Sequence, residues 1–510
     1  MALVRATEKR VGAEILVVGF ARTKNARSEK RSFEIESGDM AIDKSGLIDA
    51  LADMGATGDP DEVIKLPASG YKLLVLTGLG DKSSSGIYSH ERLRRASGAA
   101  ARSLHGQSNA TFSLPYDSIE ALAAIAEGAL LGAYTFDEFR GSSKSEHLPA
   151  LKSIEIFTVK AKKKEVVALF QRAEIIAEQV HLTRDLVNTP PSHLNPDSMA
   201  QRLKKIAVAS GLKVEILNHT QLKAKGFGGI TGVGQGSANP PRLVHISYLP
   251  KGRSNRNSDK KMKRFAFVGK GITFDTGGLA LKPALGMQAM KSDMSGAAAV
   301  VSAVIAIAKL KLNIAVDAWA PLAENMASDK ATRPSDVIKI YGGKSVEVIN
   351  PDAEGRLILA DALVRAAEVG KKGGGLDGIV DVATLTGAQV IALGTRTSAV
   401  MTNNEKFREI FLEATTRSGE QFWPMPLPEE LRPSLDSPVA DLANVGDRMG
   451  GMLVAGLFLK EFVNPQLPWL HLDIAGPAFN EGKAHGYTSV GGTGVAVHSL
   501  IALAEALATS

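Results

Sequence analysis

The chain contains no cysteine, and this absence narrows the chemistry available to it. None of its 510 residues is a cysteine, so disulfides, thiolate-bound zinc and cysteine nucleophiles are excluded. Its 10 histidines are scattered, with no pair at the spacing of metal ligands, so a histidine-based metal site is not expected either. The lack of cysteine also fits a reducing cytosol.

The sequence also lacks the features that direct a chain into or through a membrane. It begins MALVRATEKRVGAEILVV, without the basic and then apolar pattern of a signal peptide. Its most apolar run, Ala297–Ala308, is shorter than the ~18 residues that span a bilayer, and we interpret it as a buried helix. We therefore expect a cytoplasmic protein with no membrane association.

The residues that are present give the composition of a soluble globular protein. Hydrophobic residues make up 44% and charged residues 22% of the chain, and this length exceeds one ordinary core. The net charge is +6, and part of the excess lies in Lys251–Arg264, which holds seven basic residues and one acidic residue. This basic run could contact nucleic acid, although a solvated loop between two strands is the simpler interpretation.

Short β-rich runs alternate with helical patterns along the chain, which predicts an α/β fold. Examples are AEILVVGFA and YKLLVLTGLG between helical stretches such as SIEALAAIAEGALLGAY. We predict a smaller N-terminal α/β domain at 1–165, a linking helix at 166–185 and a larger C-terminal catalytic domain at 186–510. The apolar strands of the second part lack clean polar alternation, so we expect a mostly parallel or mixed sheet covered by helices on both faces.

Ionisable side chains cluster after several predicted strands of the C-terminal part. In chain order they are Lys270, Asp275, Lys282, Asp293, Asp352 and Glu354. Ligands bind at the carboxyl ends of strands in doubly wound sheets. If these ends belong to adjacent strands of one sheet, the four carboxylates share a small volume. They would then repel one another severely unless cations lie among them.

Two divalent ions would balance the four carboxylates. Oxygen ligands favour manganese or magnesium, and zinc can also enter. Two metals ~3.5–4 Å apart suit hydrolysis, with Lys282 and Arg356 as electrophilic partners or anchors for an anion. Each acidic residue taken alone is more simply a helix cap or a surface residue, but the joint pattern favours a site.

The motifs around these residues resemble those of the leucyl aminopeptidase (cytosol aminopeptidase) family of two-metal exopeptidases. The blocks VGKGITFDTGG, MKSDMSGAAAV, NPDAEGRLILADAL, DVATLTGA and HLDIAG match in order and spacing over most of residues 175–505. The N-terminal part carries little of the resemblance. Pro351, Thr276, Ala327 and Ser335 stand where the family more often has threonine, serine, proline and glycine, and none of these departures removes a metal or catalytic position.

The resemblance implies a role for each matching residue. The implied metal ligands are Lys270, Asp275, Asp293, Asp352 and Glu354, with Lys270 as a neutral amine whose pKa the ions lower. Lys282 would polarise the scissile carbonyl, Arg356 would hold a bicarbonate-like anion that acts as general base, and Asp293 would also hold the α-amino group of the substrate. The implied substrate-binding residues are Met290, Asn350, Thr384, Leu385 and Gly387.

The function implied by the resemblance is a metal-dependent aminopeptidase. It would release N-terminal amino acids, preferably leucine, from peptides in intracellular protein turnover. We expect two divalent ions per subunit, manganese first with zinc or magnesium as alternatives, and a homohexamer in the cytoplasm. Two other classes stay open here: a DNA-binding regulator, since some bacterial members of the family bind DNA, and another two-metal hydrolase such as a phosphoesterase.

Overall fold

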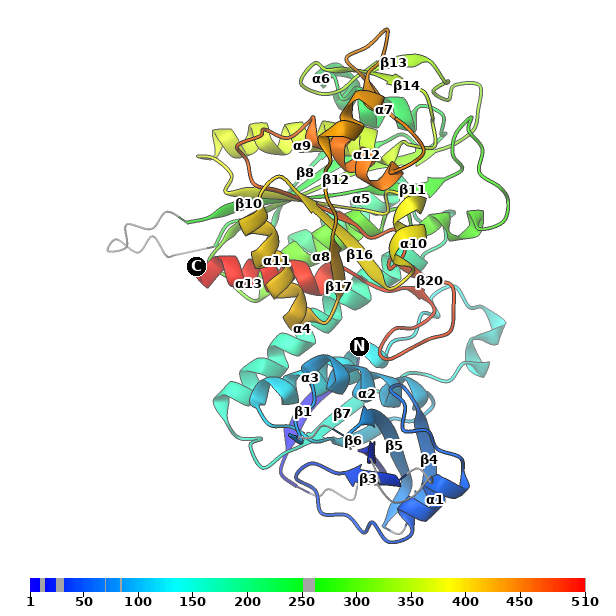
Figure 1. The fold of residues 1–510 in the computed structure, drawn as a ribbon, viewed down its shortest axis with the longest axis vertical. Coiled ribbons are helices and arrows are strands. Elements are labelled where there is room, and N and C mark those ends of the chain that lie inside the picture. Colours follow the sequence, from blue (N-terminus) through cyan, green and yellow to red (C-terminus); the bar gives the residue numbers. More distant parts are fainter. Residues whose placement is uncertain (10–13, 24–31, 69, 83–84, 251–261, 510) are drawn as a thin grey trace. The chain divides into compact units, whose positions relative to one another are not determined.

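The structure is a computed structural model that describes residues 1–9, 14–23, 32–68, 70–82, 85–250 and 262–509. These residues form two compact units (Figure 1). The smaller unit comprises Met1–His181 and Gly482–Val490, and the larger unit comprises Leu182–Glu481 and Gly491–Ser510. The division falls inside the long helix α4 (Lys164–Asn188). The late segment Gly482–Val490 belongs to the smaller unit, which the sequence patterns did not predict.

A seven-stranded mixed sheet is the centre of the smaller unit. Its order is β1-β7-β6-β2-β5-β4, with β3 beside β2. The strands from β1 to β5 in this order are parallel, whereas β3 and β4 are antiparallel to their neighbours. The strands are β1 (Leu3–Thr7), β2 (Ile15–Thr23), β3 (Ser32–Glu36), β4 (Val63–Ala68), β5 (Tyr71–Asp81), β6 (Asn109–Ser113) and β7 (Ser153–Phe157). β2 lies in the middle, and its apolar run is wholly buried from its first residue to Ala21.

The smaller unit also contains the helices α1 (Leu47–Asp53), α2 (His90–Ser103) and α3 (Ile119–Gly132), and the 3-10 turn η1 (Ser142–Glu146). α2 and α3 begin at serine N-caps, Ser89 and Ser118, whose hydroxyls accept backbone N–H groups of the first turn. The two helices pack closely because Gly128 has no side chain, since a Cβ there would lie 2.0 Å from the carbonyl oxygen of Arg94.

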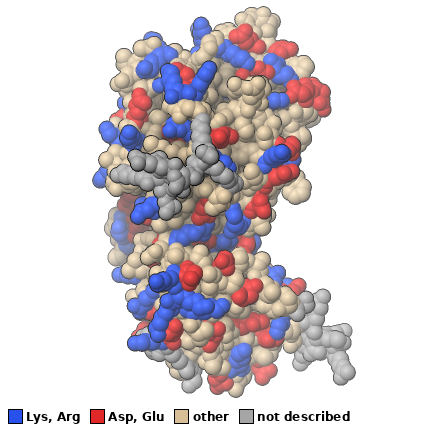
Figure 2. All heavy atoms as spheres, turned by 90° about the vertical axis from the view of Figure 1, so that its left-hand side faces the viewer, with Lys and Arg blue, Asp and Glu red and all other residues tan. Residues whose placement is uncertain are grey.

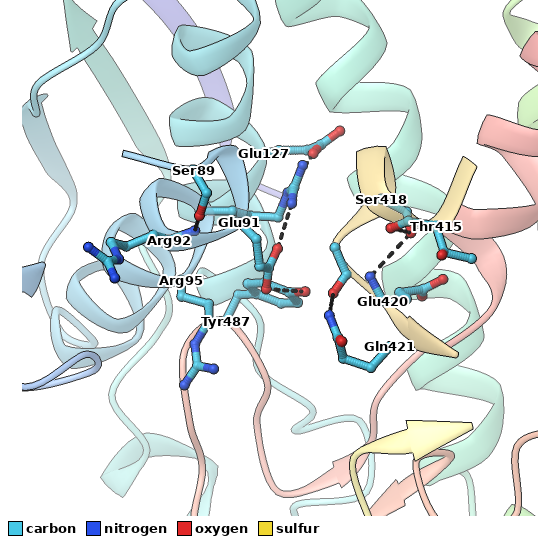
Figure 3. Close-up of polar contacts among 12 residues, drawn as sticks. Ser89, Glu91, Arg92, Arg95, Glu127, Thr415, Ser418, Glu420, Gln421 and Tyr487 are labelled. Atoms are coloured by element: carbon cyan, nitrogen blue, oxygen red, sulfur yellow. Dashed lines mark hydrogen bonds and ion pairs between the residues drawn. The ribbon is translucent and has the colours of Figure 1, made fainter. Parts of the chain in front are cut away.

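An ion cluster centred on the buried pair Arg94–Glu127 joins α2, α3 and α4 within the smaller unit. Arg94 donates to Glu127 at 2.8 Å and to Glu91 at 2.5 Å, and Arg172 lies 3.4 Å from Glu127. Tyr487, from the late segment, donates its hydroxyl to Glu91 at 3.1 Å and lies beside it in Figure 3. We call these five residues the arginine cluster.

The larger unit is built on a nine-stranded mixed sheet with a parallel centre. Its order is β17-β16-β19-β15-β10-β12-β9-β8, with β11 paired to β12. Strands β19, β15, β10 and β12 are mutually parallel, while β16, β9 and β8 run antiparallel to their inner neighbours. The strands are β8 (Lys213–Leu217), β9 (Arg242–Tyr248), β10 (Arg264–Gly269), β11 (Gly271–Asp275), β12 (Ala315–Asn325), β15 (Gly378–Ala383), β16 (Thr397–Thr402), β17 (Gln421–Pro424) and β19 (Trp469–Asp473).

Helices cover both faces of this sheet. α8 (Ser295–Lys309) and α13 (Val497–Thr509) lie on one side, and α9 (Gly355–Lys372), α7 (Gly228–Gly234) and α12 (Gly451–Lys460) lie on the other (Figure 1). The remaining helices are α5 (Pro196–Ala209), α6 (His219–Lys225), η2 (Met287–Ser292), α10 (Gly387–Leu393), α11 (Glu405–Ser418) and η3 (Glu429–Leu435). The predicted α/β class, with a smaller N-terminal domain and a mixed sheet between helices, is confirmed.

One long apolar helical stretch among the described residues is a core helix. The stretch Met287–Lys309 is long and apolar enough to cross a membrane by composition alone, but 89% of its best window is buried inside the structure. α8, which makes up most of this stretch, packs on β10, β12 and β15. The prediction of a buried helix at Ala297–Ala308 is therefore confirmed.

One assumption about the strands is wrong. The strand before Asp352 and Glu354, with the sequence VEVIN, was supposed to lie in the same sheet as the strand before Lys270. It forms β14 (Ser345–Val348) in a separate three-stranded sheet with β13 (Asp336–Lys339) and β18 (Leu442–Ala443). A fourth small sheet pairs β20 (Phe479–Asn480) with β21 (Gly491–Gly492).

Candidate functional site

The carboxyl edge of the parallel strands brings polar side chains together. β10 is followed directly by Lys270, and β12 ends at Asn325, whose register partner is Asp275 at the end of β11. β15 is followed by Thr384, and β19 ends at Asp473. Parallel strands place their carboxyl ends at the same edge of a sheet, and ligand sites form there.

Lys270 is the buried centre of the first group of contacts. Its Nζ lies 2.8 Å from Asp293 Oδ1 and 2.9 Å from Glu354 Oε1, and it donates to the carbonyl oxygen of Thr384 at 2.8 Å. Thr384 in turn donates its hydroxyl to Asp293 Oδ1 at 2.7 Å. The lysine therefore lies between two carboxylates that are 61 residues apart in the chain.

Lys282 holds the second group of contacts. Its Nζ lies 2.8 Å from Asp275 Oδ2 and also contacts Asp352 Oδ1. Asp275 is oriented by Asn325 Nδ2 and by the backbone N–H of Gly277, which each donate to its Oδ1 at 2.8 Å. The oxygens of Asp275, Asp293 and Glu354 lie within 4.8 Å of one another, so the two groups form a single site.

Two glycines are required by the closeness of this packing. Gly355 lies between Glu354 and Arg356, and a Cβ at this position would be 2.7 Å from Lys270 Nζ and 2.5 Å from its Cε. Gly277 has a φ of +85° and would place a Cβ 2.9 Å from Asp352 Oδ1. The short sequence Glu-Gly-Arg at the start of α9 therefore lets the Lys270 side chain pass over the backbone.

The four carboxylates exceed the two ammonium groups in number, and the pKa values of three of them are raised, with burial as the largest cause. The named acids carry −4 and the lysines +2, which leaves −2 when all six are ionised. Burial raises the pKa of Asp293 well above its ordinary value, with Lys270 opposing and Glu354 adding to the rise. Burial likewise raises the pKa of Glu354 and of Asp352. Burial alone would lower the pKa of Lys270, but the charges of Asp293, Glu354 and Asp275 raise it.

The residues present fit divalent metal ions. Asp293 Oδ2 is buried and has no hydrogen-bond partner among the described residues, which is costly for a carboxylate oxygen without a further cation. The donors are carboxylate oxygens and one amine, with no sulfur, as suits hard ions such as Mn²⁺. Bound divalent ions would also offset the surplus of −2 that the ionised groups carry.

Arg356 is a buried cation without an acidic partner at contact distance. Its Nη1 donates to the carbonyl oxygen of Asn444 at 2.8 Å, and its Nε has no partner among the described residues. No ion pair within 4.0 Å involves it in the described part of the chain. Burial lowers its pKa to about 10, opposed by the charges of Glu354 and Asp473.

The residues expected to bind substrate lie in different surroundings. Thr384 contacts the site directly, as described, and Met290 is half-buried in η2, three residues before Asp293. Asn350 accepts the backbone N–H of Asp352 at 2.9 Å. Gly387 opens α10, and a Cβ placed there would have no described atom within 4 Å. Leu385 is half-buried and packs against the main hydrophobic core.

Three residues of this region were not singled out from the sequence. Asn325 orients Asp275, and Asn444 binds both the Arg356 guanidinium and the backbone of Asn350. Asp473 accepts hydrogen bonds from the turn that follows β15. Asn325 and Asp473 are polar residues at the ends of parallel strands, which is the same signal that identified Lys270 and Asp275.

Residues 251–261, which form most of the basic run Lys251–Arg264, lie outside the described residues. On the face shown in Figure 2, basic and acidic side chains are interspersed over the larger unit. The nucleic-acid alternative stays a hypothesis from the sequence.

Comparison with known proteins gives matches over almost the whole chain. A model of the cytosol aminopeptidase family, catalytic domain, matches residues 181–501, and a model of the N-terminal domain of the same family matches residues 17–143. A probable cytosol aminopeptidase of Streptomyces avermitilis is 49% identical over 506 residues, covering 97% of this chain and 96% of the relative. One of Rhodococcus jostii is 46% identical, with coverages of 100% and 97%.

Solved structures show the same similarity. The bottromycin maturation enzyme BotP in complex with Mn has a TM-score of 0.83 at 35% identity, covering 97% of this chain and all (100%) of that one. A variant of tomato leucine aminopeptidase has a TM-score of 0.80 at 30% identity, covering 99% and 96%.

Proposed function

This chain belongs to the cytosol aminopeptidase family, and on that premise we propose that it releases N-terminal amino acids, with leucine preferred, from peptides in intracellular protein turnover. Members of the family are metal-dependent aminopeptidases, so the reaction is hydrolysis of the first peptide bond of a substrate. The observation that carries the proposal is the surplus of carboxylates around Lys270 and Lys282, together with the partnerless Asp293 Oδ2.

We assign the metal-binding role to the five residues Lys270, Asp275, Asp293, Asp352 and Glu354. When two divalent ions are bound, they supply Lewis acidity and lower the pKa of water at the site. Mn²⁺ is the ion we favour, because the BotP neighbour is described in complex with Mn and the oxygen-rich donor set suits it. Asp293 also takes the α-amino group of the substrate, on the resemblance to the family.

We assign one cation, Lys282, to the substrate and another, Arg356, to a bound anion. Lys282 hydrogen-bonds the oxygen of the scissile carbonyl and stabilises the negative charge that develops there. Its Nζ is held between Asp275 and Asp352, so its position is restricted before substrate arrives. Arg356 binds a bicarbonate-like anion that acts as general base. A buried guanidinium without an acidic contact favours such an anion.

The pocket for the first side chain is assigned to Met290, Thr384 and Gly387, with Asn350 and Leu385 near the substrate. The half-buried thioether of Met290 suits an apolar side chain such as leucine. Gly387 leaves open space where any other residue would place a Cβ. We also propose a homohexamer in the cytoplasm, on the resemblance to the family.

Hydrolysis of leucine p-nitroanilide by the purified protein tests this function. We expect turnover that is lost on chelation and restored by Mn²⁺. In a series of aminoacyl p-nitroanilides, kcat/KM for the leucyl compound should exceed that for the glutamyl and glycyl compounds, and an N-acetylated leucyl compound should not react. Undiminished turnover by the chelated protein would refute the proposal, and equal rates across the series would refute the leucine preference.

A further inference from the structure

The turn between β15 and α10 contacts both Lys270 and Asp293. One of its carbonyl oxygens accepts a hydrogen bond from the Lys270 ammonium, and one of its side chains donates to Asp293. No other segment of the described chain makes both contacts. This turn comprises three residues, Thr384, Leu385 and Thr386. Any shift of the turn would move the acceptor of the Lys270 ammonium and the donor to Asp293 together. The position of two proposed metal ligands therefore depends on what holds the turn in place.

Asp473 holds the other side of this turn. Its Oδ1 accepts the backbone N–H of Leu385 at 3.2 Å, and its Oδ2 accepts the hydroxyl of Thr386 at 2.7 Å. Its Oδ1 also accepts the backbone N–H of Ala475 at 3.2 Å. The same Thr386 hydroxyl accepts the backbone N–H of Gln389 at 3.1 Å as the N-cap of α10, so it links the turn, the helix and Asp473.

The surroundings of Asp473 are unusual for a structural carboxylate. The residue is fully buried, and no ion pair within 4.0 Å joins it to a cation among the described residues. A buried ionised carboxylate is costly unless several donors compensate it, and here two of its three donors belong to the turn. Its charge also acts on Arg356, whose guanidinium it favours through space.

We propose that Asp473 is a positioning residue of the metal site, which fixes Lys270 and Asp293 through the turn Thr384–Thr386 without touching metal or substrate. This inference rests on the proposed function and adds to it a residue outside the proposed ligands and substrate contacts. Partners of this kind, one layer behind the ligands, typically change metal affinity 10–100-fold when they are removed.

The neighbouring strand provides a matched control. Asp381 of β15 is as deeply buried as Asp473, and it accepts hydrogen bonds from Trp469 Nε1 at 2.7 Å and His471 Nδ1 at 2.6 Å. Neither of these partners belongs to the turn. Asp381→Asn and Asp473→Asn therefore make the same chemical change in the same sheet, and only the second removes an acceptor of the turn.

The experiment titrates chelated wild type and the variants Asp473→Asn, Asp381→Asn, Thr386→Val and Thr386→Ser with Mn²⁺ by calorimetry, alongside thermal unfolding. We expect Mn²⁺ affinity to fall about tenfold in Asp473→Asn and in Thr386→Val, and to stay within about threefold of wild type in Thr386→Ser, which keeps the hydroxyl. Asp381→Asn should lower the unfolding temperature and leave the affinity unchanged.

Equal Mn²⁺ affinity in Asp473→Asn and wild type, with only a lower unfolding temperature, would overturn the inference and make Asp473 a structural residue. If Asp473→Asn does not fold, an unchanged affinity in Thr386→Val has the same force. The wild-type titration separates the two levels: no binding to wild type refutes the proposed function itself, whereas binding that ignores Asp473 refutes only this inference.

Discussion

The arginine cluster of the smaller unit and the lysine–carboxylate site of the larger unit are each centred on a buried ion pair, yet they differ in their balance of charge. In the arginine cluster, Arg94 and Arg172 face Glu91 and Glu127, so these four charges cancel. In the site, four carboxylates face two lysines and leave −2. Burial alone therefore does not distinguish the two clusters, but the surplus of one sign does.

The arginine cluster and the site also differ in the geometry of their cations. Guanidinium groups present several N–H donors in a plane and can saturate carboxylate oxygens. Ammonium groups are compact point charges, and in the site they leave Asp293 Oδ2 without a partner among the described residues. A closed set of arginine–carboxylate pairs stabilises a fold, whereas an incomplete set of lysine–carboxylate pairs leaves room for further cations.

The largest effect expected from this comparison is on catalysis, in Glu354→Gln. The substitution keeps the shape and removes one proposed ligand, so we expect kcat/KM to fall at least about a thousandfold, or ~4 kcal/mol of transition-state stabilisation. Because burial raises the pKa of Glu354, the neutral amide should not destabilise the metal-free protein. Steady-state kinetics and chemical unfolding measure both, and a variant that keeps full activity would contradict the ligand assignment.

The opposite pattern is expected from Glu127→Gln in the arginine cluster. It removes the charge of the carboxylate that both Arg94 and Arg172 contact, and breaking a buried pair costs about 3 kcal/mol of unfolding free energy. Denaturant unfolding followed by circular dichroism measures the loss. Mn²⁺ content and kcat of the folded variant should match wild type, and a loss of bound metal would show that the two clusters are not separable in this way.

Mn²⁺ should stabilise the protein against unfolding by binding at the four carboxylates of the site, and not by binding elsewhere. At a free concentration of 100 times Kd, one bound ion adds about 2.7 kcal/mol to the unfolding free energy. Differential scanning calorimetry should therefore show a rise in Tm with Mn²⁺ for wild type and for Glu127→Gln, and a much smaller rise for Glu354→Gln. An equal rise in all three would place the ion elsewhere.

The unfolding free energy of the metal-free protein should depend on pH, with an effect of intermediate size. The pKa values of Asp293, Glu354 and Asp352 are raised in the folded state, so the folded protein binds their protons more tightly than the unfolded chain does. These three groups therefore stabilise the folded state at pH values below their unfolded pKa near 4, and this stabilisation is lost as pH rises through their folded pKa values. Each tenfold difference in proton affinity between the two states contributes about 1.4 kcal/mol to the unfolding free energy. Unfolding at several pH values, with and without Mn²⁺, tests this, because bound ions should abolish the decline.

The smallest expected effect is a change in stability at a residue outside both clusters. Ser335 is exposed and has a φ of +73°, a left-handed conformation that costs a residue with a side chain ~1–2 kcal/mol. Ser335→Gly removes this cost but frees the unfolded chain, so we expect a net gain of about 0.5 kcal/mol. A loss of stability on thermal unfolding would mean that the serine side chain makes a compensating contact.

The features that could be predicted from the sequence are those that follow from local patterns. The strand before Lys270, the helix after Asp293 and the α/β alternation depend on short apolar runs, and the structure contains each of them. The placing of polar residues at strand ends also identified Lys270 and Asp275, which the structure brings together with Asp293 and Glu354.

The features that were missed depend on contacts between distant residues. A strand of four residues such as β14 carries no mark of its partner, so its separate sheet was not foreseen. Tyr487 and Glu91 are 396 positions apart, and no local pattern indicates that the late segment belongs to the smaller unit. Asp473 could have been found by the strand-end rule, but its role depends on the conformation of the turn after β15.

The most direct test of the central claim is the number of Mn²⁺ ions bound per chain, measured by equilibrium dialysis and elemental analysis on the protein used for leucyl p-nitroanilide hydrolysis. The proposed function predicts two ions per chain in wild type and in Glu127→Gln, with activity that follows their occupancy. Full activity in protein that holds no divalent metal would contradict the account.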